Sequence, residues 1–318
     1  MAGRATTPRV MMGANVDARA RRRSSQRAIE QRTAYLFIAP WVIGFLVFTL
    51  GAMIYSFGLS LFDTDLLSKH DFVGLQNYDQ LIRDPLFHKS LRVTLIYTAI
   101  TVPFGTLIAL GIALMLNQKI RGASFWRTIY YLPAVVSGVA VSLIWNWVLN
   151  SQSGLLNQAL GWFHIEGPRW FADERWAIVG LALIALWGTG TNMLLYLAGL
   201  QSIPTELQEA ARIDGAGAWR TFFAVTLPLL TPTIFFNVVI NVINSFQVFT
   251  NAYVLTQGGP NNATLTLVVF LYKQSFQLFH FGYASAIAWV VFAIILVFTL
   301  LLVRSSEHWV HYEGGLRK

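Results

Sequence analysis

The sequence predicts an all-α integral membrane protein with six transmembrane helices. Three observations predict this fold class: the apolar composition, the clustering of the charges, and the distribution of Lys and Arg among the loops. Hydrophobic residues make up 55% of the 318 residues and charged residues 12%, against roughly 25% charged in an average soluble chain. The mean hydropathy is +0.53. The chain has no cysteine, which excludes a small disulfide-stapled secreted domain and thiolate metal sites.

Six long stretches without Asp, Glu, Lys or Arg define the candidate membrane spans. A helix needs about 20 mostly apolar residues to cross roughly 30 Å of hydrocarbon, so each stretch can hold at least one span. A soluble α/β enzyme would spread its charges over every exposed helix face, and this segregation argues against one. The stretches are 33–62, 93–118, 128–165, 176–205, 221–272 and 274–303.

Six helices are expected, one in each stretch. The two longest stretches exceed the length of one span, and the additional residues are polar or turn-forming. These residues are Asn150–Ser153 after the third helix and Gln257–Asn262 after the fifth. The segment Leu265–Tyr272 is too short to be a seventh span. The expected helices lie near Tyr35–Leu61, Val93–Leu116, Ile129–Leu149, Trp176–Leu200, Pro232–Leu255 and Tyr283–Val303.

Basic residues in the loops orient the spans, because cytoplasmic loops carry an excess of Lys and Arg. The loops and tails on one side of the expected spans hold 16 of the 23 basic residues, and those on the other side hold seven. The richer side includes both ends of the chain, which we therefore expect in the cytoplasm. The division is an Arg-rich tail (1–33), a membrane domain (34–303) and a C-terminal tail (304–318).

The arginine run of the N-terminal tail could be interpreted as a nucleic-acid-binding arm, given the net charge of +8. Beside a membrane span, its simpler role is to fix topology and to attract anionic lipid, at about 1 kcal/mol per basic residue. We therefore expect contact with membrane lipid and no nucleic-acid partner.

The expected spans contain no charged residue, so ion-coupled transport has no obvious coupling group. A phosphate-binding loop of the form G-x-x-x-x-G-K-[ST] is also absent from the sequence. We find no convincing catalytic constellation and no metal-ligand pattern, and predict neither catalytic residues nor a metal site. Any uphill transport would draw its energy from another polypeptide.

The loop 201–231, between the fourth and fifth spans, carries the strongest local signal. Pro204 stands near the head of a predicted helix, and acidic Glu209 follows early, where the helix dipole favours negative charge. Gly215 allows a sharp turn before a second short helix, which Pro228 is expected to end. This helix–turn–helix is mostly apolar, which indicates a partner surface.

This loop resembles a known pattern. The run Glu209-Ala210-Ala211, then Gly215, then Val225-Thr226-Leu227-Pro228 is similar to the EAA loop of permease subunits in ATP-binding-cassette importers, E-A-A-x₃-G-x₉-I-x-L-P. Only Val225 departs from that pattern, where the family has Ile. Matches at Phe72–Tyr78, Leu197–Pro204 and Leu255–Pro260 resemble the maltose-type permeases of carbohydrate importers. The resemblance runs from about Tyr35 to Val303 and leaves out the N-terminal tail.

The resemblance implies an assembly in a bacterial or archaeal cytoplasmic membrane. It consists of a second permease subunit, two cytoplasmic ATPase subunits and an extracytoplasmic sugar-binding protein. ATP and Mg²⁺ would bind to the ATPases, and this chain would hold no cofactor. Glu209 would be the polar contact to the ATPase, and the small residues after it the packing face. The implied coupling residues are Glu209, Ala210, Ala211, Asp214, Gly215, Leu227 and Pro228.

A neutral polyol needs amide and hydroxyl partners, and the fifth span offers six such side chains. At about 100° per residue they fall within one roughly 160° helical face, which cannot face lipid without cost. They either hydrogen-bond neighbouring helices or contact a solute. The six are Asn237, Asn241, Asn244, Ser245, Gln247 and Asn251.

The resemblance favours substrate contact, because related permeases place their sugar contacts on this span. The implied substrate residues are Asn241, Asn244, Ser245, Gln247 and Asn251, with Trp187, Thr191 and Asn192 of the fourth span as weaker candidates. The function expected from the resemblance is inward movement of a sugar by alternating access.

Three alternatives remain open at this stage. An importer permease for glycerol phosphate or another organic solute would favour Arg or Lys facing the path. A membrane enzyme acting on lipid-linked sugar would need paired carboxylates, and Asp63 with Asp65 is the only nearby pair. A self-standing uniporter would move its solute without any ATPase.

Overall fold

The computed structural model describes residues 30–118 and 120–310. The chain divides into two compact units, Met1–Gly58 and Leu59–Lys318, which are described one at a time. In the first unit a helix begins at Glu30 and runs to Leu59, long and apolar enough to cross a membrane. It contains the π-helical segment η1 (Phe45–Leu50), followed by α2 (Gly51–Leu59). The first expected span is therefore helical.

The second unit opens with a short hairpin that the helical prediction did not include. Strand β1 (Phe62–Thr64) pairs antiparallel with β2 (His70–Phe72), with Phe62 opposite Phe72. The Asp65 carboxylate closes the turn by accepting the backbone N–H groups of Leu67, Ser68 and Lys69. This side-chain cap stabilises a turn where apolar composition alone indicated only a loop.

Helices α3 (Gln76–Arg83) and α4 (Pro85–Leu116) follow the hairpin. Asp84 caps α4 by accepting the Leu86 N–H at 2.7 Å, and Pro85 occupies the first helical position. The Tyr283 hydroxyl donates to the other oxygen of Asp84 at 2.7 Å. The start of α4 is thus tied to the last helix of the chain.

The prediction of one continuous helix over Ile129–Leu149 is wrong, because two helices occupy this stretch. Helices α5 (Ala123–Val135) and α6 (Gly138–Val148) meet at an angle of 101°. Pro133 lies near the end of α5, and the backbone is extended at Val136, with ψ of 139°. Proline removes an amide donor and crowds the preceding turn, so the helix stops within a residue or two. Helix α7 (Leu155–Trp162) lies in the loop that follows.

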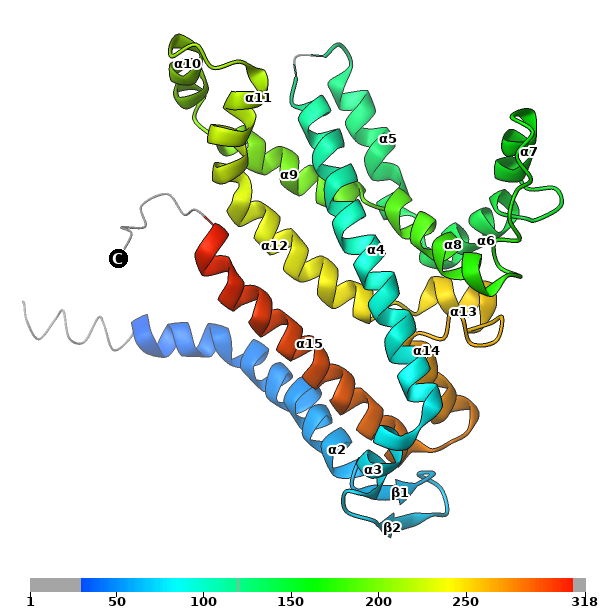
Figure 1. Ribbon diagram of the computed structural model, residues 1–318. Helices are drawn as coiled ribbons and strands as arrows, with labels where there is room; N and C mark the ends of the chain where they lie inside the picture. The colour runs from blue at the N-terminus through cyan, green and yellow to red at the C-terminus, as the bar shows by residue number, and fades with distance from the viewer. Residues whose placement is uncertain (1–29, 119, 311–318) are drawn as a thin grey trace, which may run out of the picture. The chain divides into compact units, whose positions relative to one another are not determined.

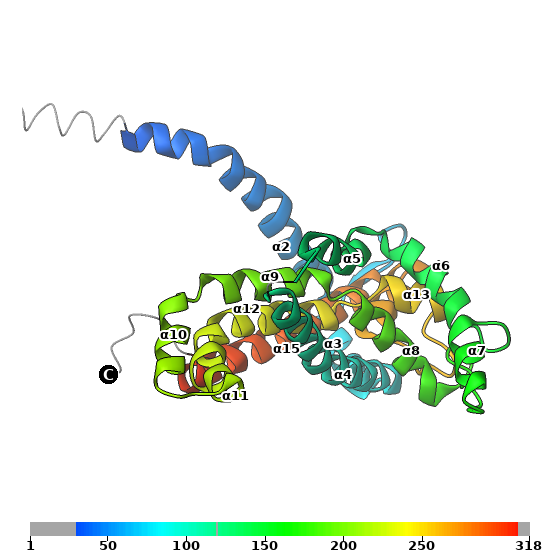
Figure 2. The same cartoon turned by 90° about the horizontal axis from the view of Figure 1, so that it is seen from above.

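The fourth expected helix is bent. Helices α8 (Glu174–Trp187) and α9 (Gly190–Ser202) meet at 45°, with Gly188 and Thr189 between them. The loop after α9 forms α10 (Thr205–Ile213) and α11 (Ala218–Thr221). Both views place α10 and α11 at the same end of α9 and α12 (Figures 1 and 2).

The fifth expected helix, Pro232–Leu255, is the later part of a longer helical run, Ala218–Thr256. Within this run, the π-helical segment η2 (Phe222–Thr226) leads into α12 (Leu227–Phe246), and α13 (Thr250–Thr256) follows after a break. Pro228 was expected to end a helix. It instead stands in the first turn of α12. The ring is compatible with this position because the first amides of a helix have no intrahelical acceptor.

The chain ends its described part with α14 (Leu267–Tyr272), the π-helical segment η3 (Lys273–Gln277) and α15 (Phe281–Trp309). α14 agrees with the expectation that Leu265–Tyr272 is too short to span. Within residues 30–118 and 120–310, four helices are long and apolar enough to cross a membrane, or up to six if each bent pair is one span.

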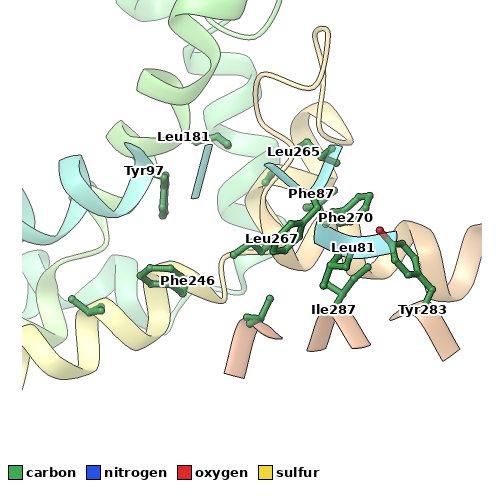
Figure 3. Close-up of a cluster of buried hydrophobic side chains, with 14 of the residues drawn as sticks. Leu81, Phe87, Tyr97, Leu181, Phe246, Leu265, Leu267, Phe270, Tyr283 and Ile287 are labelled. Atoms are coloured by element: carbon green, nitrogen blue, oxygen red, sulfur yellow. The ribbon is translucent and has the colours of Figure 1, made fainter. Parts of the chain in front are cut away.

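Two buried clusters hold the second unit together. The larger joins α3, α4, α8, α12, α14 and α15, and in Figure 3 Phe87, Leu267 and Phe270 gather near its centre. Among its labelled members are Leu81, Phe87, Tyr97, Leu181, Phe246, Leu267, Phe270 and Ile287. The second cluster lies between α4, α9 and α12 toward the α10 end and includes Ala109, Ala113, Met193, Tyr196 and Leu230.

Gly190 lies where the backbone of α9 packs closely against that of α5. A Cβ atom at this position would collide with the carbonyl oxygen of Tyr130 and lie 2.9 Å from the Cα of Tyr131. We expect Gly190→Ala to destabilise the fold by about 1–3 kcal/mol, because backbone atoms must move apart. Gly111→Ala is the matched control, since a Cβ there meets no described atom within 4 Å. Thermal unfolding of the purified protein in detergent compares them, and equal transition temperatures would contradict the expectation.

Candidate functional site

The loop between α9 and α12 forms a compact helix–turn–helix. The Asp214 N–H, at the end of α10, donates to the Ala210 carbonyl at 3.0 Å, and the Ala216 N–H donates to the Ala211 carbonyl at 2.9 Å. Gly215 between them has a φ of +79°, the left-handed region that favours glycine. The predicted turn is therefore present at this glycine.

This end of the molecule presents both charge and large apolar side chains. Glu209 and Ala210 are exposed on α10 and Ala211 is half-buried. Ile213 is 86% exposed, and the Trp219 ring stacks on that of Phe223 with centroids 6.1 Å apart. Leu227 and Pro228 are half-buried at the start of α12. We call these exposed groups of α10, α11 and η2 the α10–α11 surface.

The α10–α11 surface is connected at both ends to membrane helices. Only Ile203 and Pro204 separate α9 from α10, and the Ile203 side chain is buried. On the other side α11 runs through η2 into α12 without a break. A force on α10 would therefore reach α9 and α12 directly.

A cavity of about 210 Å³ lies between α4, the α8–α9 bend and α12. Its described lining contains hydroxyls, amides and apolar groups, and none of these side chains is charged. The lining residues are Tyr97, Thr101, Val102, Gly105, Ala185, Gly188, Thr189, Asn192, Asn241, Asn244, Ser245 and Val248. Four of the predicted substrate residues, Asn192, Asn241, Asn244 and Ser245, are thus brought together in one cavity.

Three of these four side chains also join helices. The Asn192 side-chain amide donates an N–H to the side-chain oxygen Oδ1 of Asn241 at 2.9 Å, linking α9 to α12. The Ser245 hydroxyl donates to the Thr98 hydroxyl at 2.9 Å, linking α12 to α4. Asn244 is exposed at the cavity. The amide face of α12 therefore serves interhelical bonding and also lines a polar space.

The other four predicted substrate residues lie outside this cavity. Thr191 is exposed, and the Trp187 ring packs edge-on against Trp145 at 5.8 Å. Gln247 lines a separate, largely apolar groove between α12, α14 and α15. Asn251, on α13, accepts the Ser142 hydroxyl of α6 at 2.9 Å.

The expectation of one continuous polar face is wrong beyond Phe246. α12 ends at that residue, so Gln247 and Asn251 no longer follow its helical phase. Asn237 keeps the phase but is buried, and its amide donates to the Thr233 carbonyl at 2.9 Å.

The contribution of α4 to the cavity was not among the residues predicted from the sequence. Tyr97, Thr101 and Gly105 stand one helical turn apart and together form one wall of the cavity. This spacing was present in the second span, where a small and polar stripe runs along an otherwise apolar helix. A search for such stripes in every span would have found it.

A larger pocket, of about 440 Å³, lies at the hairpin end of the second unit and includes Asp63, Asp65, Lys69 and His280 in its lining. The pKa of Asp65 is held well below its usual range by the backbone N–H of Lys69, by the Ser68 hydroxyl and by further backbone amides. The pKa of Lys69 is raised by its ion pair with Asp63. These charges are paired and exposed, so the pocket suits a surface contact better than a solute path.

In the described part of the chain, no group of three or more His, Asp or Glu side chains is placed to hold a metal ion. The chemistry that these residues offer is therefore that of neutral hydrogen-bonding groups within the bundle and of exposed apolar and charged groups at its α10 end.

Comparisons with known proteins agree with this arrangement. The probable ABC transporter permease protein YesP of Bacillus subtilis (strain 168) is 39% identical over 96% of this chain and 99% of its own length. The multiple sugar-binding transport system permease protein MsmF of Streptococcus mutans is 37% identical, over 77% of this chain and 84% of its own. Both are named as permease proteins, which are non-catalytic transport components.

The fold is that of a solved transporter. A chain in the crystal structure of a bacterial ABC transporter that imports the acidic polysaccharide alginate superposes with a TM-score of 0.77 at 24% identity, over 90% of this chain and 98% of that one. A bacterial alginate ABC transporter was also crystallised in complex with its alginate pentasaccharide-bound periplasmic protein. Residues 101–310 match the family model described as "binding-protein-dependent transport system inner membrane component". The chain thus belongs to this family, the membrane permease components of ATP-binding-cassette transporters.

Proposed function

We propose that this chain is the permease subunit of an importer that moves a sugar inward by alternating access, driven by partner ATPases. The observation that carries the proposal is the placement of an uncharged polar cavity between α4, α9 and α12, two of which flank the E-A-A loop. Amide and hydroxyl groups recognise neutral polyols without fixing a charge. The sugar-transport name of MsmF supports this class of cargo.

The proposed topology has six spans with both termini in the cytoplasm. The four long helices and the two bent pairs supply the spans, and α10 is the coupling helix. We retain the division into a tail (1–33), a membrane domain (34–303) with the loop 201–231, and a second tail (304–318). The tails fall largely outside the described residues, as does the arginine run that we expect to attract membrane lipid.

The proposed partners are a second permease subunit, two ATPases that hold ATP and Mg²⁺, and a sugar-binding protein outside the membrane. The exposed apolar groups of the α10–α11 surface suit the ATPase contact, with Glu209 as its polar group. The hairpin-end pocket suits the binding protein, because its ion-paired rim is open to solvent. The structure of an alginate transporter with its periplasmic protein supports a partner of this kind.

Asn192, Asn241, Asn244 and Ser245 are the substrate contacts that we propose within this chain. A phosphorylated cargo would need a cationic side chain, and the described lining offers none, so glycerol phosphate is the weaker candidate. An enzyme acting on lipid-linked sugar would place carboxylates at the site, whereas Asp63 and Asp65 lie in the separate pocket at the hairpin end.

Reconstitution tests the proposed function. The complex, assembled in liposomes with a second permease subunit and two ATPases, should accumulate labelled sugar only when ATP and the binding protein are both present. Accumulation by this chain alone would identify a uniporter, and uptake of a phosphorylated solute in preference to every neutral sugar would reject sugar as the cargo.

A further inference from the structure

Three buried polar atoms lie next to the cavity in the direction of α10, and the proposed function does not use them. The Thr106 Oγ1, the Tyr196 hydroxyl and the Asn237 Oδ1 have no hydrogen-bond partner among the described residues. Tyr196 is fully buried and Asn237 is 1% exposed. Leaving such atoms unpaired destabilises a fold, so each requires an explanation.

The helix register places Tyr196 and Asn237 at the same level of the α9–α12 interface. Asn192 of α9 bonds Asn241 of α12, and further along the same pair of helices a Cβ at Gly199 would lie 2.7 Å from the Thr233 hydroxyl oxygen. The helices run antiparallel between these two contacts, so Tyr196, one turn beyond Asn192, stands level with Asn237, one turn before Asn241.

Thr106 completes the group from α4. The Tyr196 hydroxyl approaches the Thr106 hydroxyl without reaching hydrogen-bond geometry. Thr106 directly follows Gly105, which lines the cavity. Beyond this level the interface of α4, α9 and α12 is closed by apolar side chains, including Ala113, Leu197 and Leu200. The three polar residues therefore form one layer across the α4–α9–α12 interface. The cavity lies on one side of this layer, and the apolar side chains, which we call the seal, lie on the other.

We propose that Tyr196 is the gate of the cavity on the α10 side, and that the three polar atoms form a second hydrogen-bonding site for the sugar or its water. The inference rests on the proposed function. α9 and α12 are the helices joined to the α10–α11 surface, so movement of α10 acts on the interface that Tyr196 fills. When the interface opens, the unpaired atoms gain partners.

The unpaired atoms would also bias the gate. Their cost is present only while the interface is closed, and hydration or a sugar hydroxyl removes it on opening. Removing one of these polar groups while keeping the packing should therefore favour the closed gate. The gate residue is a positioning and access group, and the cavity itself would bind sugar as before.

Transport kinetics test the hydroxyl. In the reconstituted complex, Tyr196→Phe should lower the maximal uptake rate about three- to tenfold, the range of a lost hydrogen bond. The concentration of sugar-loaded binding protein that gives half-maximal uptake should stay unchanged. Met193→Leu is the matched control, because it alters a buried neighbour on α9 at nearly constant volume. An equal loss in this control would assign the effect to packing and overturn the proposal.

Thiol labelling tests the opening without relying on uptake. The chain has no cysteine, so Thr106→Cys introduces the only thiol of this subunit, whose labelling is followed on the separated subunit. A small membrane-impermeant thiol reagent added from the α10 side should label it in only one of the nucleotide-free and ATP-trapped states. Ala113→Cys, in the seal between Thr106 and the α10 side, should become labelled in that same state and not in the other. If Thr106→Cys is unlabelled in both states while the variant complex still takes up sugar, the gate is elsewhere. If the unaltered complex transports no sugar, the proposed function fails instead.

Discussion

Exchange of Glu209 for leucine is expected to reduce uptake to the level of a complex without ATPase subunits, while insertion and assembly of the permease continue. Glu209 is exposed on α10, the helix most directly connected to α9, and packs into no described core. Its loss therefore costs the fold little, within about 0.5 kcal/mol. The effect on uptake should come from a weakened contact with the ATPase, because leucine cannot form the hydrogen bonds or ion pair of the Glu209 carboxylate.

Glu206→Leu supplies the matched control on the same helix. Glu206 is also exposed, but it belongs to the first turn of α10 and lies outside the E-A-A run. We expect uptake within about twofold of the unaltered complex, because only a helix-end charge is lost. Initial rates of labelled-sugar uptake and co-purification of the ATPase measure both variants. Normal uptake and normal ATPase retention with Glu209→Leu would reject this residue as the coupling contact.

Sequence patterns located the helices well because hydrocarbon thickness imposes a length that composition reveals. The second and sixth expected spans fall within α4 and α15. The failure at the third span has a local cause, since Pro133 can either kink a helix or end it, and the outcome depends on what packs against the freed backbone. No apolar pattern contains that information. The hairpin was missed because its stability comes from the capping bonds of Asp65.

The candidate site was predicted in part for a similar reason. The phase of α12 correctly grouped Asn241, Asn244 and Ser245, because one unbroken helix carries all three. It grouped Gln247 and Asn251 with them only by extending the helix past its end at Phe246. The part of the cavity lined by α4 and the position of Tyr196 beside it depend on which helices are neighbours. The periodicity of a single span does not contain that information.

The distinction between Asn244 and Gln247 leads to the second large expected effect. Asn244→Leu should reduce uptake at least about tenfold, because an amide that can bond a sugar hydroxyl is replaced by a group that leaves that hydroxyl unpaired. Assembly should be unaffected, since Asn244 is exposed at the cavity and the helix-joining bonds of Asn241 and Ser245 remain.

Gln247→Leu makes the same chemical change three residues further along, at a residue that lies in the apolar groove beside α15. We expect uptake within about twofold of the unaltered complex, because the new side chain suits its surroundings. Uptake rates at saturating binding protein, with the amount of assembled complex measured on the same samples, separate the two variants. A large loss of uptake with Gln247→Leu and a small one with Asn244→Leu would place the substrate path in that groove instead of the cavity. This follows because the C-terminal end of α12 borders both spaces, and the two variants differ in which space loses an amide.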